Sequence, residues 1–254
     1  MLLAIDIGNT NITLGVFQGE QLRATWRLAP DVNRLADEYG VLMVSLLSQE
    51  GIDREDLDAA VMSSVVPDLE VVFEQVCHRY FDVRPLVVGT GVRTGLRILY
   101  DSPRDVGADR VADAVAGIQL YGTPLILVDL GTGAVFDAIS KEGDYLGGAI
   151  APGLSIAAEA LYRRAAKLYR VELAVPKTAI GRNTVSAVQS GLIFGYVGLI
   201  EGIIARFKQE LGGEAKVVAT GGWAELLAPE TTVIDAVDPD LTLTGLRMIY
   251  EMNR

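Results

Sequence analysis

The chain of 254 residues has little of the side-chain chemistry on which many enzymes depend, because it contains one cysteine, Cys77, and one histidine, His78. A single cysteine excludes an internal disulfide and fits a reducing cytosol. A single histidine argues against a histidine-based catalytic triad or a multi-histidine metal site. We expect Cys77 to be a small buried hydrophobe on a helix, and His78 to lie on a helix face or at the surface.

Positive charge and long apolar runs are also scarce. The chain has 22 Lys and Arg against 33 Asp and Glu, a formal net charge of −11. This balance argues against nucleic acid or an anionic membrane as a partner, because both require clustered positive charge. The first residues carry no basic region and their apolar run stops at Asp6, so we expect no signal peptide. The longest uncharged stretch, residues 183–200, contains polar residues and glycines and makes a poor membrane span. These features predict a globular cytoplasmic protein.

Two common phosphate-binding motifs are missing as well. The sequence has no Gly-x-x-x-x-Gly-Lys-Ser/Thr, and no Gly-x-Gly-x-x-Gly after a strand, so the P-loop and Rossmann modes of nucleotide binding are excluded. It has instead a tight turn, Asp6-Ile-Gly-Asn-Thr-Asn, between the apolar runs 1–5 and 12–17. Gly8 would let the backbone approach a ligand, and successive turn N–H groups can cradle phosphate oxygens. For this one copy alone an ordinary β-hairpin is the better explanation, because any turn favours Gly, Asn and Asp.

A second copy of the turn changes that balance. Asp129-Leu-Gly-Thr-Gly follows the apolar run 124–128 and precedes the run 134–139, so Asp129 occupies the place that Asp6 has in the first copy. A repeat at about half the chain length indicates a duplicated domain rather than a solenoid, whose periods are about 20–50 residues. We therefore predict two halves, residues 1–121 and 122–254, packed together without a linker. Their two hairpins would clasp one nucleotide in the cleft between the halves.

The hydrophobic pattern predicts the same order of elements in both halves, three hairpin-type strands followed by helices and further strands. This order is typical of a mixed α/β layer structure. The expected strands are residues 1–5, 12–17, 22–28, 59–66, 85–88, 124–128, 134–139, 145–150 and 216–219. The expected helices are residues 35–47, a helix starting at Pro67, and residues 154–169, 184–211 and 241–252.

Eight short motifs, in order along nearly the whole chain, resemble those of the type III pantothenate kinases, members of the acetate and sugar kinase, Hsc70 and actin superfamily. They are Asp6-Ile-Gly-Asn-Thr, Gly91-Val-Arg-Thr-Gly, Tyr100-Asp, Gly107-Ala-Asp-Arg, Asp129-Leu-Gly-Thr, Gly147-Gly-Ala-Ile-Ala-Pro-Gly, Ile180-Gly-Arg-Asn-Thr and Thr220-Gly-Gly. The resemblance implies an α/β fold of duplicated ribonuclease H-like (actin-like ATPase) domains, with mixed sheets flanked by helices. It also implies ATP-dependent phosphorylation of pantothenate to 4'-phosphopantothenate, the first step of coenzyme A biosynthesis.

The resemblance further implies the residues of the site. Phosphoryl transfer mainly requires positioning and charge neutralisation, so few reactive side chains are needed. The implied ATP-binding residues are Asp6, Ile7, Gly8, Asn9, Thr10, Asn11, Ile12, Thr13 and Thr132. The implied substrate-binding residues are Tyr100, Gly107, Ala108, Asp109, Arg110 and Thr184. The implied cofactors are Mg²⁺ at Asp6, a hard oxygen ligand, and a monovalent cation, K⁺ or NH₄⁺, at Asp129.

Within the substrate set, we expect Asp109 to be the catalytic base and Arg110 to bind the substrate carboxylate with two parallel hydrogen bonds. From the residues alone, an exposed Asp-Arg pair opening a helix explains these positions, since Asp is common near helix N-termini. Thr184 is likewise a good helix start. The Gly221-Gly222 pair after a strand would let adenine approach the backbone.

The chain departs from the family pattern where Gly133-Ala-Val replaces the usual Ala-Thr-Thr, which removes two hydroxyls. Each could contribute a hydrogen bond of about 0.5–1.5 kcal/mol, so the affinity for nucleotide or K⁺ is in question. Thr90 also stands where proline is usual, which mostly loosens a loop. Two other functions stay open: a nucleotide-binding regulator like the Bvg accessory factors, which would not need Asp109, and a hydrolase that uses water as acceptor and needs neither Tyr100 nor Arg110.

The helix expected at residues 184–211 predicts a homodimer. Its apolar surface extends too far round the helix to be covered by one sheet face, and four glycines recur along it. Glycine in a helix interior costs roughly 0.8–1.0 kcal/mol relative to alanine, so close packing must offset it. A central buried helix would explain the same pattern. The resemblance to a dimeric family favours the dimer.

Overall fold

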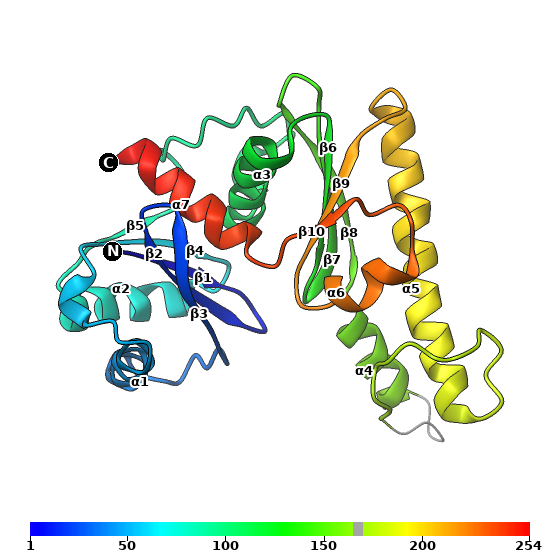
Figure 1. Ribbon diagram of the computed structural model, residues 1–254, viewed down its shortest axis with the longest axis horizontal. Coiled ribbons are helices and arrows are strands. Elements are labelled where there is room, and N and C mark those ends of the chain that lie inside the picture. Colours follow the sequence, from blue (N-terminus) through cyan, green and yellow to red (C-terminus); the bar gives the residue numbers. More distant parts are fainter. Residues whose placement is uncertain (165–169) are drawn as a thin grey trace. The chain divides into compact units, whose positions relative to one another are not determined.

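The computed structural model describes residues 1–164 and 170–254, which form two compact units. The first unit comprises residues 1–95, 101–116 and 241–254, and the second comprises residues 96–100 and 117–240. The C-terminal helix thus belongs to the first unit, although the repeat in the sequence places it in the second half of the chain. Figure 1 shows the elements of both units along the chain.

The first unit contains a mixed five-stranded sheet, which we call sheet A, in the order β3-β2-β1-β4-β5. Its strands are β1 (Leu2–Ile7), β2 (Ile12–Gln18), β3 (Gln21–Leu28), β4 (Ala59–Ser64) and β5 (Pro85–Val87). β1 pairs antiparallel with β2 and parallel with β4. Strand β1 is therefore central, and its nearly continuous burial follows from having strands on both sides.

Two helices, α1 (Ala36–Gln49) and α2 (Pro67–Phe81), form the hydrophobic core of the first unit with one face of sheet A. The start of α1 is capped by Glu38, whose carboxylate accepts the backbone N–H of Leu35 at 2.9 Å. Helix α2 begins at Pro67, as the sequence predicts. Cys77 is buried on α2, and burial raises the pKa of its thiol to about 12, so it is an inert core residue as expected.

The other face of sheet A carries α7 (Leu241–Asn253), which contacts β1, β2 and β4. Glycines permit this packing. A Cβ atom on Gly15 of β2 would lie 2.8 Å from the Leu243 side chain. One on Gly245 would lie 2.0 Å from the carbonyl oxygen of Ala112 in α3 (Ala108–Tyr121), so α7 and α3 cross at backbone distance.

The second unit repeats the topology of the first in a second sheet, sheet B, in the order β8-β7-β6-β9-β10. Its strands are β6 (Leu125–Leu130), β7 (Gly133–Ile139), β8 (Tyr145–Pro152), β9 (Lys216–Thr220) and β10 (Ala236–Val237). β6 corresponds to β1: it pairs antiparallel with the next strand and parallel with the strand after the intervening helices. The duplication predicted from the two hairpins is therefore present in the order and direction of the strands.

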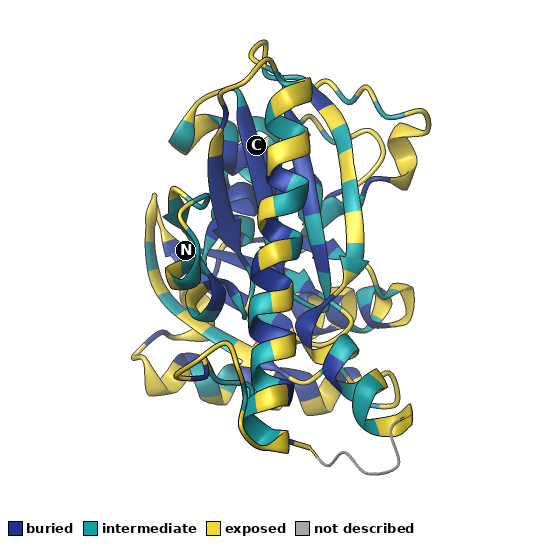
Figure 2. Cartoon of the chain, turned by 90° about the vertical axis from the view of Figure 1, so that its right-hand side faces the viewer, coloured by how far each residue is buried: buried dark blue, intermediate teal, exposed yellow. Residues whose placement is uncertain are grey.

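Helices α4 (Leu154–Arg164), α5 (Thr184–Glu210) and the short α6 (Ala224–Leu227) pack with sheet B in the core of the second unit. The helix predicted at residues 154–169 is confirmed up to Arg164, and its last five residues lie outside the described part. Among the described residues, α5 alone is long and apolar enough to cross a membrane. Its buried residues, however, belong to the core of the unit, and Figure 2 shows buried and exposed bands alternating along it.

Candidate functional site

The first hairpin places its polar residues between the ends of β1 and β2. Its turn is closed by a hydrogen bond of 2.9 Å from the Gly8 N–H to the Asn11 carbonyl oxygen. A Cβ atom on Gly8 would lie 2.9 Å from that oxygen, so the turn requires glycine. Asn9, Thr10 and Asn11 are exposed at the tip, whereas Ile7 and Ile12 are buried in the core. The predicted phosphate-binding residues thus form one continuous turn, with Thr13 next along β2.

Asp6 lies at the end of β1 on the face of sheet A opposite to the α1–α2 core. Its Oδ1 accepts a hydrogen bond of 2.7 Å from the Ser63 hydroxyl of β4. Burial raises the pKa of Asp6 from 3.8 to about 7, the Ser63 hydrogen bond lowers it, and the charge of Asp109 raises it further. The structure therefore brings Asp6 and Asp109 within electrostatic reach of each other inside the first unit.

Asp109 stands in the first turn of α3, as the simpler interpretation of the Asp-Arg pair also predicted. Its Oδ1 accepts the backbone N–H of Arg110 at 2.8 Å, and the partial positive charge of the helix N-terminus favours a carboxylate here. A Cβ atom on Gly107 would lie 2.3 Å from the same oxygen, so glycine leaves the space that this carboxylate occupies. All four residues 107–110 are half-buried.

Asp129 occupies the corresponding place at the end of β6 in the second unit. Glycines surround its carboxylate: a Cβ atom would lie 2.3 Å from Oδ1 if placed on Gly221, and 3.2 Å from it if placed on Gly131. Gly221 also has a positive φ of 89°, which favours glycine. The absence of side chains on these two glycines leaves room beside the Asp129 carboxylate.

Thr132 lies in the turn between β6 and β7, where its carbonyl oxygen accepts the N–H of Gly153 at 3.1 Å. A Cβ atom on Gly153 would lie 2.1 Å from the same oxygen. The start of α4, which follows Gly153, is therefore pressed against the second hairpin. The indole N–H of Trp223 donates to the Ser155 hydroxyl at 3.1 Å, which ties this helix start to the Gly221-Gly222 turn.

The two remaining predicted substrate residues, Tyr100 and Thr184, belong to the second unit but to separate places in it. The Tyr100 ring lies 3.3 Å from the position of a Cβ atom on Gly147 of β8. Thr184 is the first residue of α5, after the cap formed by Asn183, whose Oδ1 accepts the Ser186 N–H at 2.9 Å.

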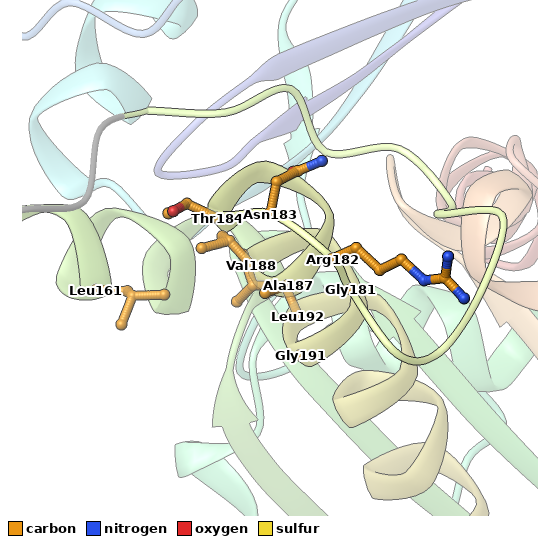
Figure 3. Close-up of a pocket in the computed structure, with 9 residues that line it drawn as sticks. All are labelled: Leu161, Gly181, Arg182, Asn183, Thr184, Ala187, Val188, Gly191 and Leu192. Carbon is orange, nitrogen blue, oxygen red and sulfur yellow. The ribbon is translucent and has the colours of Figure 1, made fainter.

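Thr184 lines a pocket of about 660 Å³ between α4 and the start of α5 (Figure 3). The described residues that line it are Leu161, Gly181, Arg182, Asn183, Thr184, Ala187, Val188, Gly191 and Leu192. They include no other predicted site residue.

The donor atoms of the first hairpin fit a magnesium ion that is only partly bound by protein. The described residues contain no group of three or more His, Cys, Asp or Glu side chains able to enclose a metal. Mg²⁺ commonly keeps several waters and uses one or two carboxylates together with substrate phosphates. The paired carboxylates of Asp6 and Asp109 match this requirement, because a divalent cation would relieve their mutual repulsion.

Sequence reasoning missed Ser63, the hydroxyl partner of Asp6. The available signal was small: two serines, Ser63 and Ser64, close an otherwise apolar strand. Only the parallel pairing of β1 with β4 places one of them opposite Asp6.

Comparison with known proteins identifies the sequence pattern and the fold. The family model described as "Type III pantothenate kinase" matches residues 2–206. A solved structure described as a Baf family transcriptional activator, from Campylobacter jejuni, is 20% identical over 99% of this chain and 98% of that chain, with a TM-score of 0.62. One described as a 2-dehydro-3-deoxygalactonokinase, from Sinorhizobium meliloti, is 11% identical over 100% and 99%, with a TM-score of 0.60. Component A of the Acidaminococcus fermentans (R)-2-hydroxyglutaryl-CoA dehydratase is 15% identical over 96% and 94%, with a TM-score of 0.51. With the repeated strand order, these likenesses show the predicted fold of duplicated ribonuclease H-like, actin-like domains.

Proposed function

The chain belongs to the type III pantothenate kinase family, and we propose that this kinase transfers the γ-phosphoryl group of ATP to the hydroxyl of pantothenate. The product would be 4'-phosphopantothenate, at the first step of coenzyme A biosynthesis. The observation that supports the proposal is that the charge of Asp109 acts on Asp6 within one unit. We propose that the first carboxylate holds the metal and the second acts as the base.

In the proposed reaction, the pantothenate hydroxyl oxygen attacks the γ-phosphorus while the bond between this phosphorus and the β,γ-bridging oxygen breaks, and ADP leaves. Asp109 accepts the hydroxyl proton as the oxygen becomes acidic. The Arg110 guanidinium binds the pantothenate carboxylate, for which its planar fork is suited. The N–H groups of the first hairpin hold phosphate oxygens.

The proposed cofactors are Mg²⁺ at Asp6 and K⁺ or NH₄⁺ at Asp129. When bound, Mg²⁺ neutralises charge that develops on the phosphate oxygens. Asp129→Ala should therefore change the K⁺ dependence of turnover, while Asp6→Ala should weaken the response to Mg²⁺. If neither variant alters any metal dependence, these two aspartates do not hold the proposed cations.

We test the reaction by measuring ADP release with and without pantothenate. The proposal expects release only when pantothenate is present, and release in its absence would identify water as the acceptor instead. A protein that binds ATP without releasing ADP under either condition would be a nucleotide-binding regulator, which would accord with the description of the Campylobacter jejuni structure as a transcriptional activator. Asp109→Asn serves as the control that removes the base without removing a phosphate contact.

We also propose a homodimer that uses the outer side of α5. Figure 2 shows exposed bands, in yellow, alternating with buried ones along α5. Exposed small residues follow one another along its outer side. They are Ala187, Gly191, Gly195 and Gly198, and a Cβ atom on any of these three glycines would meet no atom within 4 Å. Such a surface allows a second helix to approach closely. Sedimentation at micromolar concentration should give twice the chain mass of 27.2 kDa, and a single 27.2 kDa species would refute the dimer.

A further inference from the structure

At the carboxyl ends of β1 and β4, the Ser63 hydroxyl contacts the Asp6 carboxylate. The proposed reaction assigns no role to this hydroxyl. In the parallel register of these strands, Asp6 lies directly opposite Ser63. The Ser63 Oγ donates to Asp6 Oδ1 at 2.7 Å. Ser63 is fully buried, with 0% of its surface exposed. The hydroxyl therefore has a fixed neighbour and no access to solvent.

Packing alone does not explain a serine at this position. Ala60 and Met62 of the same strand point into the α1–α2 core, so Ser63 lies on the opposite face, with Asp6. A buried hydroxyl without a partner costs about 1–3 kcal/mol, and alanine would fill nearly the same space without this cost. The Ser63 hydroxyl donates to the Asp6 carboxylate, so the contact with Asp6 is what compensates for its burial.

The second unit repeats the strand register of this pair, with a hydroxyl-bearing residue opposite the aspartate. In the parallel register of β6 with β9, Asp129 lies opposite Thr220, whose exposed fraction is 3%. Among the described residues, five polar or charged side chains are buried: Ser63, Asp113, Asp137, Thr220 and Arg247. Two of these five thus stand at the same topological position, each on the parallel strand beside a hairpin aspartate.

We propose that Ser63 and Thr220 are positioning residues that hold the Asp6 and Asp129 carboxylates in the orientation in which they bind cation and phosphate. The inference rests on the proposed function, because it assigns a purpose to these two carboxylates. A hydroxyl that holds one oxygen of a carboxylate prevents rotation and leaves the other oxygen directed at the cation. Loss of such a supporting hydrogen bond commonly lowers metal affinity by about 10–100-fold.

The strand on the other side of each aspartate differs between the units. Asp6 pairs with Thr13 across β1 and β2, whereas Asp129 pairs with Val135 across β6 and β7. The first aspartate therefore has a hydroxyl-bearing residue opposite it on both neighbouring strands, and the second has one on β9 only.

The test measures Mn²⁺ binding to the full chain in the presence of ADP, from the loss of the electron paramagnetic resonance signal of free Mn²⁺. This readout requires no catalytic turnover. Ser63→Ala should weaken Mn²⁺ binding by about 10–100-fold. Ser64→Ala is the matched control, because the Ser64 hydroxyl bonds to the backbone of Val66 and not to Asp6. It should bind Mn²⁺ as the unchanged protein does.

Asp6→Ala separates failure of this inference from failure of the proposed function. If Asp6→Ala abolishes binding while Ser63→Ala stays within about threefold of the unchanged protein, the role of Ser63 is refuted and the metal site stands. Equal losses in Ser63→Ala and Ser64→Ala would also refute it, because they would reflect disturbance of β4. If Asp6→Ala binds Mn²⁺ unchanged, the proposed metal site itself is wrong. Ser63→Cys replaces the hydroxyl by a slightly larger and weaker donor and should give an intermediate loss. It serves in place of Ser63→Ala if that variant fails to fold.

Thr220→Val tests the second pair, because it removes the hydroxyl while conserving shape. The thermal unfolding midpoint is measured as K⁺ is added. The readout is the K⁺ concentration at which half of the rise in this midpoint has occurred. We expect this concentration to increase at least tenfold relative to the unchanged protein. The role of Thr220 would be refuted if Thr220→Val left this K⁺ concentration unaltered while Asp129→Ala abolished the K⁺ effect. The role of Asp129 would then stand.

Discussion

Replacing Asp6 by asparagine should stabilise the metal-free protein at alkaline pH, although it should impair catalysis. Asparagine has the same shape, and its carbonyl oxygen can still accept the hydrogen bond from Ser63. It cannot ionise, however, and so it avoids placing a negative charge at a largely buried position near Asp109. The first unit should therefore tolerate the neutral amide of Asp6→Asn better than an ionised Asp6 whenever Mg²⁺ is absent.

The magnitude follows from the pKa of Asp6, which burial raises from 3.8 to about 7. At about 1.36 kcal/mol per pH unit, this rise sets an upper limit of about 4 kcal/mol. Asp6 keeps some exposure, so solvent screening reduces the expected value to about 2–4 kcal/mol at pH 8. Between pH 3.8 and about 7 the folded state binds more protons than the unfolded state, and stability falls as the pH rises through this window.

The assay compares the free energy of unfolding of Asp6→Asn and the unchanged protein by urea titration in EDTA. Trp26 fluorescence in a Trp223→Phe background reports on the first unit, because the chain contains two tryptophans. The advantage of Asp6→Asn should grow by about 1–2 kcal/mol from pH 5.5 to pH 8. Glu20→Gln, in the exposed β2–β3 turn, is the control and should show no such growth. The electrostatic reasoning would be refuted if the difference in unfolding free energy between Asp6→Asn and the unchanged protein did not depend on pH. It would also be refuted if Asp6→Asn were the less stable of the two at pH 8.

Four further predictions follow from the site and its packing. Asp109→Asn should lower turnover by about 10²–10⁴-fold while ATP binding, measured by calorimetry, stays within about threefold; near-normal turnover would exclude Asp109 as the base. Arg110→Ala should raise the KM for pantothenate far more than the KM for ATP in steady-state kinetics, and an equal rise in both would indicate a structural role. Val135→Thr should lower the K⁺ concentration needed for half-maximal turnover by restoring a hydroxyl opposite Asp129, and an unchanged or higher requirement would contradict this. Gly245→Ala should destabilise the first unit by about 1–3 kcal/mol in urea unfolding, because the added methyl group meets the Ala112 backbone; unchanged stability would mean that α7 moves aside freely.

Several predictions depended on short-range pattern and were correct for that reason. The two hairpins could be predicted because an apolar run, a Gly-containing polar turn and a second apolar run lie within about 15 residues of one another. Their repetition then predicted two equivalent sheets, which the orders β3-β2-β1-β4-β5 and β8-β7-β6-β9-β10 confirm. The helix start at Pro67 followed from local chemistry in the same way.

The assignment of residues to a substrate, a cation or a partner chain rested instead on resemblance to a family. Asp109 illustrates the limit. An Asp-Arg pair at a helix start is ordinary from the sequence alone, and only the structure shows that its charge acts on Asp6 and that Gly107 leaves room for its carboxylate.

By itself, the sequence determined most strands, most helices, the duplication and the two hairpin aspartates, because each depends on residues that are close together along the chain. Tertiary structure alone decided the partner of each aspartate and the location of α7. Ser63 reaches Asp6 across 57 positions, through a parallel pairing whose register no local pattern specifies. Helix α7 joins the first unit because the glycines at positions 15 and 245 remove the atoms that would keep it away. Long-range pairing and close backbone contact depend on the whole fold, and for that reason these features become visible only when the chain is folded.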